Sequence, residues 1–217
     1  MNTALLFAGV MPAAAGDSIV GRAEPIDGDT FAIGDLVIRL ADVDAPELAQ
    51  TCEKAPKHLR RCGEHVAGII AHRIRGQTVH CDVQEVDQYD RGIARCEHDG
   101  EDLSVWLIEE GWAMAYRRYS MRLVDLEDRA KAEKVGLWAA SFEAPWDYRA
   151  KRWDVAIQEA PDGCPIKGNI SRDGKQIYHT PWGSRWYNRT KVSIDDGERW
   201  FCTEGEAIAA GWRAPRR

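Results

Sequence analysis

The stretch from residue 26 to residue 47 constrains the fold of this chain more than any other segment. Two runs of mainly apolar residues flank the Gly-Asp pair at 34–35, a pattern that predicts a β-hairpin with a tight turn. The outer ends of this hairpin carry Asp29 and Asp44, with Glu47 just beyond. Because folding the hairpin brings these carboxylates together, they would repel one another unless a cation lay among them.

Arg39 lies on the return strand of the same hairpin and points toward either the mouth of the hairpin or the core. Carboxylate oxygens suit hard divalent metal ions, and a planar guanidinium fork suits phosphate oxygens. The residue types at the hairpin mouth therefore predict a site for a metal ion and a phosphate group.

Further short motifs follow along the chain and can be compared as an ordered set. The motifs are Asp27-Gly28-Asp29-Thr30, Arg39-Leu40, Asp44-Ala45-Pro46-Glu47, Asp87-Gln88-Tyr89-Asp90-Arg91-Gly92, the stretch from Gly111 through Tyr116, and Gly136-Leu137-Trp138. Together they resemble the staphylococcal nuclease (thermonuclease) family, from about residue 18 to residue 149. The resemblance implies an endonuclease that acts on DNA and RNA with little sequence specificity and leaves 3′-phosphate ends.

The metal ligands that the resemblance implies are Asp29 and Asp44, and the backbone carbonyl of Ala45 could add a third oxygen. Ligation by oxygens alone, with few carboxylates, favours Ca²⁺, with Mg²⁺ or Mn²⁺ as alternatives. A bound divalent ion polarises a phosphoryl oxygen and can position water. The implied cofactor is therefore Ca²⁺.

The resemblance also implies roles for residues that touch the substrate. Arg39 and Arg91 would present planar forks to phosphate oxygens and stabilise the pentacoordinate state. Glu47 would act on the attacking water, as base or as orienting group. Tyr89 and Tyr116 match family tyrosines that contact the nucleotide.

Two positions near Arg91 depart from the family pattern. Asp90 stands where the family commonly has Gly, and Asp tolerates a positive φ better than most other residues. Its carboxylate could also pair with Arg91 and weaken the grip of that arginine on phosphate. Gln88 stands where the best-known member has a lysine, which removes one positive charge. Neither departure touches Asp29, Arg39, Asp44 or Glu47, so we expect activity, at a full or a reduced level.

Six cysteines, an even number, predict three disulfides in an exported chain. The local pattern indicates the partners. Cys81 and Cys96 fall on successive strands, Cys52 and Cys62 enclose a short polar loop, and Cys164 and Cys202 bracket the C-terminal segment. The alternative is a cytosolic protein with reduced, buried cysteines.

Residues 1–16 are interpreted as a signal peptide or apolar leader. The run from Ala4 to Ala15 is apolar and ends in small residues that fit a cleavage site. It is too short to span a bilayer as a mature helix. No Lys or Arg precedes Arg22, so the usual positive start of a signal peptide is missing. We expect a secreted or periplasmic protein with no membrane contact in its mature form.

The remaining periodicities predict an α+β, mainly β, fold. Strands are expected at 18–25, 78–86 and 91–97, helices at 64–75, 102–110 and 120–135, and a polar loop at 48–63. Small antiparallel strands with helices at the side suit a five-stranded, partly open barrel with three helices. The resemblance narrows this barrel to the OB type.

The chain is expected to divide into a nuclease-like domain at 18–143, a linker at 144–162 and a small module at 163–217. Thr203 and Glu206 form a capping-box pattern for a last helix in the module. The basic and aromatic residues of the module could bind nucleic acid or a cell-wall surface, although so many aromatics in a small unit more often form its core. The sequence identifies no partner for the module and no stable protein partner for the whole chain.

The net charge of −6 opposes long-range attraction to nucleic acid, so a nuclease of this composition needs a local basic patch and a metal ion. One alternative is a non-catalytic nucleic-acid or envelope binding protein with a nuclease-like barrel. Another is an accessory protein of envelope or exopolysaccharide assembly. The acidic ligands and both arginines implied by the resemblance are all present, which favours the endonuclease.

Overall fold

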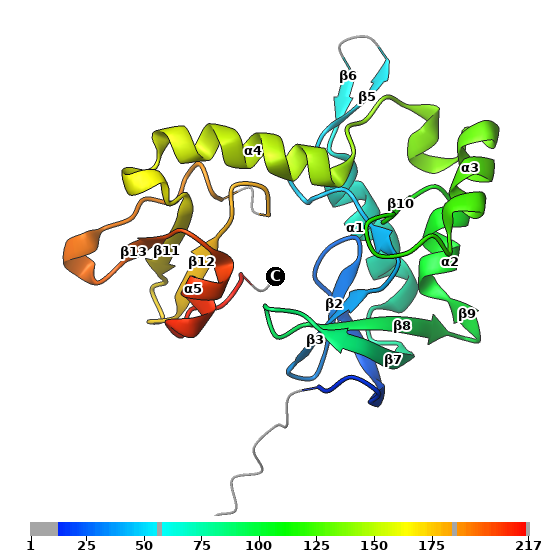
Figure 1. Ribbon diagram of the computed structural model, residues 1–217, viewed down its shortest axis with the longest axis horizontal. Coiled ribbons are helices and arrows are strands. Elements are labelled where there is room, and N and C mark those ends of the chain that lie inside the picture. The colour runs from blue at the N-terminus through cyan, green and yellow to red at the C-terminus, as the bar shows by residue number, and fades with distance from the viewer. Residues whose placement is uncertain (1–12, 56–57, 184–185, 216–217) are drawn as a thin grey trace, which may run out of the picture.

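The computed structural model describes residues 13–55, 58–183 and 186–215 (Figure 1). Most of the expected leader at 1–16 lies outside these residues. Within the described part of the chain, each helix is too short or too polar to cross a membrane.

A closed β-barrel occupies the first half of the chain. Its strands are β1 (Ser18–Pro25), β2 (Thr30–Ile33), β3 (Leu36–Leu40), β7 (Thr78–Val86) and β8 (Gly92–His98), with the short β9 (Glu101–Asp102) beyond β8. Neighbouring strands pair antiparallel in the order β3-β2-β1-β7-β8-β9, and a parallel pairing of β3 with β8 closes the barrel. The OB-type, α+β fold expected from the sequence is confirmed.

The β2–β3 hairpin forms as predicted, with Gly34 at a φ of 61° in its turn. Phe31 on β2 and Ile38 on β3 are fully buried in the barrel core. Because side chains alternate along a strand, Arg39 points away from the face that Ile38 occupies. Arg39 pairs with Thr30 across the hairpin and lies at its mouth, not in the core.

Three helices flank the barrel: α1 (Cys62–Ile74), α2 (Leu103–Glu109) and α3 (Val124–Glu133). The first two lie close to their predicted bounds. The third was expected to begin at Ser120 and instead begins at Val124, after Leu123. The Ser120 hydroxyl accepts from the backbone N–H of Arg122, and this local turn takes the place of the first helical turn.

Smaller elements connect the barrel to its helices. β4 (Val43–Asp44) pairs with β10 (Met114–Ala115), so Asp44 lies opposite Met114. The loop expected at 48–63 contains a small hairpin of β5 (Cys52–Ala55) and β6 (His58–Arg60). A 3₁₀ turn, η1 (Gly136–Ala139), follows α3.

The segment interpreted as a linker is a helix, α4 (Pro145–Glu159), followed by the 3₁₀ turn η2 (Pro161–Gly163). Pro145 occupies the start of the helix, where its fixed φ is favourable and its missing N–H costs nothing. In Figure 1 this helix runs from the barrel to the C-terminal module.

The C-terminal module consists of β11 (Ile166–Ile170), β12 (Gln176–His179), the 3₁₀ turn η3 (Ile194–Asp196), β13 (Arg199–Phe201) and α5 (Glu204–Ala209). Its strands lie in the order β12-β11-β13. The Thr203 hydroxyl caps α5 by accepting from the N–H of Glu206, as the capping-box pattern predicted. Its buried core is Ile166, Tyr178, Phe201, Ala207 and Trp212.

Three disulfides join the cysteines in the pairs that local spacing predicted. They are Cys52–Cys62, Cys81–Cys96 and Cys164–Cys202. Two of the bridges lie in the barrel domain and the third joins the start of the module to the end of β13. Each is expected to stabilise its unit by about 2–4 kcal/mol.

Candidate active site

The mouth of the β2–β3 hairpin brings Asp29, Arg39 and Asp44 together. Arg39 Nη1 lies 3.2 Å from Asp29 Oδ1, and Arg39 Nη2 lies 2.9 Å from Asp44 Oδ1. Asp29 and Asp44 are buried, at 6% and 1% exposure. The arginine therefore bridges two buried carboxylates that would otherwise repel each other.

Ala45 completes this cluster through its backbone. Its N–H donates to Asp29 Oδ2 at 2.8 Å, while the Thr30 hydroxyl donates to Asp29 Oδ1 at 3.0 Å. These contacts fix the Asp29 carboxylate against the segment that follows β4. The structure thus places the three residues predicted to ligate a metal, Asp29, Asp44 and Ala45, side by side.

Two more carboxylates, Asp27 and Glu47, border the cluster. Burial, followed by the nearby charge of Asp29, raises the pKa of Asp27 to about 6. Burial also raises the pKa of Glu47 to about 8, although Arg149 opposes the shift. Asp27 belongs to the first motif, but no ligand role was assigned to it from the sequence. Burial is the largest cause of both shifts, so the raised pKa values show that these two carboxyl groups are held away from water.

Arg149, on α4, also enters the site. Its Nη2 lies 2.7 Å from Asp44 Oδ2, and its Nη1 lies 3.0 Å from Asp44 Oδ1 and 2.8 Å from Glu47 Oε1. Sequence reasoning missed this residue as a member of the site. It stands at the end of the family-like region and outside every recognised motif, so the sequence offers no local signal for its position.

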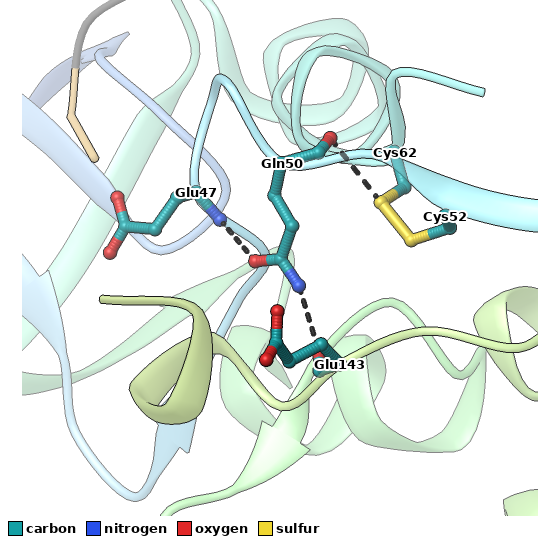
Figure 2. Close-up of a disulfide and its surroundings, with 5 residues drawn as sticks. All are labelled: Glu47, Gln50, Cys52, Cys62 and Glu143. Atoms are coloured by element: carbon teal, nitrogen blue, oxygen red, sulfur yellow. Dashed lines mark hydrogen bonds between the residues drawn. A yellow bond between two sulfur atoms is a disulfide. The ribbon is translucent and has the colours of Figure 1, made fainter. Parts of the chain in front are cut away.

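Gln50 fixes the backbone that carries Glu47 (Figure 2). Its side-chain oxygen accepts from the Glu47 N–H at 3.1 Å, and its side-chain nitrogen donates to the Glu143 carbonyl at 2.6 Å. Gln50 is fully buried, and its own carbonyl accepts from the N–H of Gly63 at the start of α1. The Cys52–Cys62 disulfide lies beside this network in Figure 2. The loop after β4 is therefore tied both to α1 and to the segment before α4.

Arg91 lies at the turn between β7 and β8 and is held by Asp87. Arg91 Nε donates to Asp87 Oδ2 at 2.8 Å, and the guanidinium lies 5.1 Å from the ring centre of Tyr89. The partner of Arg91 is thus Asp87 and not the neighbouring Asp90. Asp90 itself has a φ of 57°, the positive value that explains why Gly suits this position.

Tyr116 lies beside the hairpin mouth and contacts both arginine and aromatic neighbours. Its ring stacks on Trp146 of α4, with ring centres 5.9 Å apart and an interplanar angle of 15°. The Arg39 guanidinium lies 6.0 Å from the same ring. Trp146 is a second member of the site that no sequence motif identified.

A large cleft, of about 2080 Å³, joins these groups and continues onto the C-terminal module. From the barrel it is lined by the carboxylate cluster, both predicted arginines and both predicted tyrosines. From the module it is lined by Tyr178, Trp182, Trp186, Glu204 and Trp212, among others. In Figure 1 the turn between β7 and β8 points across toward α5. Barrel and module thus form two walls of one cleft.

The donor set suits a hard cation in kind, since it offers the carboxylate oxygens of Asp29 and Asp44. Among the described residues, however, no three His, Cys, Asp or Glu side chains converge as a metal site would need. Both Asp44 oxygens accept hydrogen bonds from Arg149. In donor type the residues fit a divalent cation, while in this structure Arg149 holds both oxygens of Asp44.

Comparisons with known proteins single out the same region. The family described as "Staphylococcal nuclease homologue" matches residues 37–140, which include Arg39, Asp44, Glu47 and Arg91. The chain is 34% identical over 134 residues to the succinoglycan biosynthesis protein ExoI of Rhizobium meliloti (strain 1021), covering 60% of this chain and 70% of that protein.

Two further relatives have names that refer to nuclease activity. The micrococcal nuclease of Shigella flexneri is 28% identical over 142 residues, covering 57% of this chain and 76% of that protein. The probable endonuclease LCL3 of Saccharomyces cerevisiae (strain ATCC 204508 / S288c) is 30% identical over 128 residues, covering 52% of this chain and 45% of that protein.

Proposed function

Because this chain belongs to the staphylococcal nuclease family, we propose that it is an exported, Ca²⁺-dependent endonuclease that hydrolyses phosphodiester bonds in DNA and RNA. It acts with little sequence specificity and leaves 3′-phosphate ends. The observation that carries the proposal is the convergence of Asp29, Arg39 and Asp44 in the wall of a large cleft.

A phosphodiester resists hydrolysis because its negative charge repels nucleophiles and its alkoxide is a poor leaving group. Fixed positive charge that meets the developing charge of the transition state lowers this barrier. Arg39 is held in place by two buried carboxylates, so its fork needs little reorganisation to receive phosphate oxygens. Arg91, held by Asp87 at the rim, supplies a second fork.

Asp29, Asp44 and the carbonyl of Ala45 would hold the cation. When bound, the cation would polarise a phosphoryl oxygen. Glu47, on the loop that Gln50 ties down, would orient the attacking water or accept its proton. Tyr89 and Tyr116 would contact the nucleotide beside the two arginines.

Export is supported by the three disulfides, because such bonds persist in oxidising compartments and are rare in the cytosol. We place the protein outside the cytosol, as a secreted or periplasmic enzyme. The barrel, the α4 segment and the module are proposed as the units at 18–143, 144–162 and 163–217.

A second candidate function is a non-catalytic nucleic-acid or envelope binding protein. One observation favours it: both oxygens of the buried Asp44 are bonded to Arg149, so the acidic site is neutralised by a residue of the chain itself. One relative is named for succinoglycan biosynthesis and not for nuclease activity, and this name agrees better with a non-catalytic role. Measurement of metal-dependent cleavage separates the two candidates.

The test is cleavage of single-stranded DNA and of RNA by the oxidised protein, with Ca²⁺ or with EDTA. Cleavage should require Ca²⁺, and Glu47→Gln should lower its turnover by about 10²–10⁴-fold because a positioned acid–base group is lost. Glu133→Gln makes the same change on an exposed face of α3 and should leave turnover unchanged. No cleavage by folded protein with Ca²⁺, Mg²⁺ or Mn²⁺ would contradict the proposal and leave the binding role.

The module wall of the cleft leads to a prediction about substrate affinity. Trp186 lines the cleft and is 47% exposed, so a nucleobase could stack on its ring. Because stacking contributes about 1–3 kcal/mol per base, Trp186→Ala should raise KM for single-stranded DNA about tenfold with little change in kcat. The buried Trp212 is unsuitable as a control, whereas the exposed Ile194→Ala variant should leave KM unchanged. An unchanged KM in Trp186→Ala would place the substrate away from the module.

A further inference from the structure

The first turns of α4 place a positive charge directly on the carboxylates of the hairpin mouth. Arg149 spans both oxygens of Asp44, at 2.7 and 3.0 Å, and also reaches Glu47. The Asp44 side chain is 1% exposed and that of Arg149 is 22% exposed. A bidentate, charge-assisted pair of this kind is among the strongest polar contacts in proteins. It differs in this respect from an ordinary surface ion pair.

The attachment of α4 to the barrel holds Arg149 at this position. Gln50 donates to the Glu143 carbonyl just before the helix begins. Trp146, in the first turn, stacks on Tyr116 of the barrel. These two contacts precede Arg149 along the chain and direct its side chain into the mouth. The contact with Asp44 is therefore built into the way the helix joins the barrel.

The two arginines at the mouth differ in what holds them. Arg39 belongs to β3, which hydrogen-bonds to strands on both sides, and it also contacts Asp29. Arg149 belongs to a helix outside the barrel and contacts only one of the two proposed carboxylate ligands. A divalent cation between Asp29 and Asp44 would repel both guanidinium groups. The arginine on the helix can withdraw without breaking the barrel.

We propose that Arg149 is an internal competitor of the divalent cation, which occupies Asp44 and Glu47 in the free protein and must withdraw before a metal ion binds Asp44. This inference rests on the metal site of the proposed function. When only part of the population is competent to bind, the apparent affinity is the intrinsic affinity multiplied by that fraction. Removal of the competitor should therefore raise the apparent affinity for the cation.

The test is isothermal titration calorimetry of the full chain with CaCl₂ alone, in the absence of nucleic acid. Arg149→Gln should bind Ca²⁺ about tenfold more tightly than the wild type, a change typical of coupling between linked equilibria. Lys151→Gln removes the same charge from the same helix, but Lys151 pairs with Glu143 and is largely exposed. It should change the affinity by less than about twofold, since exposed charges are screened.

Arg149→Lys keeps the charge but cannot span both oxygens of Asp44, so its Ca²⁺ affinity should lie between those of the wild type and Arg149→Gln. If Arg149→Gln fails to fold, the Ca²⁺ affinity of Arg149→Lys still tests the inference. Thermal unfolding gives an independent readout, because Ca²⁺ should raise the Tm of Arg149→Gln more than that of the wild type.

Equal or weaker Ca²⁺ binding by a folded Arg149→Gln, or a matching gain in Lys151→Gln, would overturn the inference. So would the absence of binding in every variant at about 10 mM Ca²⁺, well above the range of extracellular calcium sites. Because no nucleic acid is present, these outcomes are separate from failure of the cleavage assay. If the protein cleaves nucleic acid but Arg149→Gln has unchanged Ca²⁺ affinity, only the inference about Arg149 is overturned and the proposed function stands.

Discussion

Gly63→Ala is expected to lower the Tm by about 6–12 °C, a loss of about 3 kcal/mol for a protein of this size. A Cβ at position 63 would lie 1.7 Å from the carbonyl oxygen of Glu47 and 2.9 Å from the Cα of Leu48. Both contacts are with backbone, so no side-chain rotation can relieve them. The loop must move, and it carries the residue proposed to act on water. We therefore expect turnover to fall together with stability.

Gly68→Ala is the matched control in the same helix. A Cβ at position 68 would meet nothing within 4 Å. Alanine favours a helix interior over glycine by about 0.5–1 kcal/mol, so this variant should have a slightly raised Tm and unchanged turnover. Differential scanning calorimetry and the cleavage assay measure both effects. A Gly63→Ala variant as stable as Gly68→Ala would show that α1 does not approach the Glu47 loop this closely.

Arg39→Lys is expected to lower kcat by about 10²–10³-fold with little change in stability. Lysine keeps the positive charge between Asp29 and Asp44, so the buried carboxylates retain compensation. It cannot present two parallel N–H groups to a phosphate, because its ammonium is a compact charge on a flexible stem. The loss should appear in kcat, since the fork is proposed to stabilise the transition state more than the bound substrate.

Arg122→Lys makes the same chemical change at an arginine that also bridges two carboxylates, those of Asp42 and Asp102. Arg122 does not itself line the cleft, although its partner Asp42 does, and Arg122→Lys should leave kcat within about twofold, as surface substitutions usually do. Steady-state kinetics on one oligonucleotide would compare the two variants. Equal kcat values for Arg39→Lys and the wild type would remove Arg39 from the proposed chemistry.

The hairpin mouth could be predicted from the sequence because its signals are local. A Gly-Asp turn between two apolar runs fixes the register, and the register brings Asp29 and Arg39 together with Asp44. The disulfide partners were predictable for a similar reason, since two of the three pairs lie in adjacent or nearby segments. The helix expected at Ser120 was misplaced because the serine hydroxyl closes a turn of its own.

Arg149 and Gln50 could not be found in the same way. Arg149 meets Asp44 across 105 positions of sequence, and Gln50 meets Glu143 across 93. Contacts at such separations depend on where α4 packs, and no hydrophobic periodicity or turn residue predicts that packing position. The helix itself was hidden because the segment contains Pro145 and Pro161 and carries mixed charge, a composition that also suits a linker. Tertiary packing therefore supplied the part of the site that the motifs left out.

The first turns of α4 and its middle have different attachments, and this has a consequence for how the molecule can be studied. Near its start the helix holds Trp146 on Tyr116 and Arg149 on Asp44. Further along, Arg152 donates to the carbonyl of Pro181, and Trp153 packs against Trp182. A molecule that binds the module and shifts α4 would change the cation affinity of the proposed site at Asp44. A cation bound there would change the affinity for that molecule by the same factor. With calcium at the proposed site, a calcium titration would therefore be a means of screening for ligands of the module.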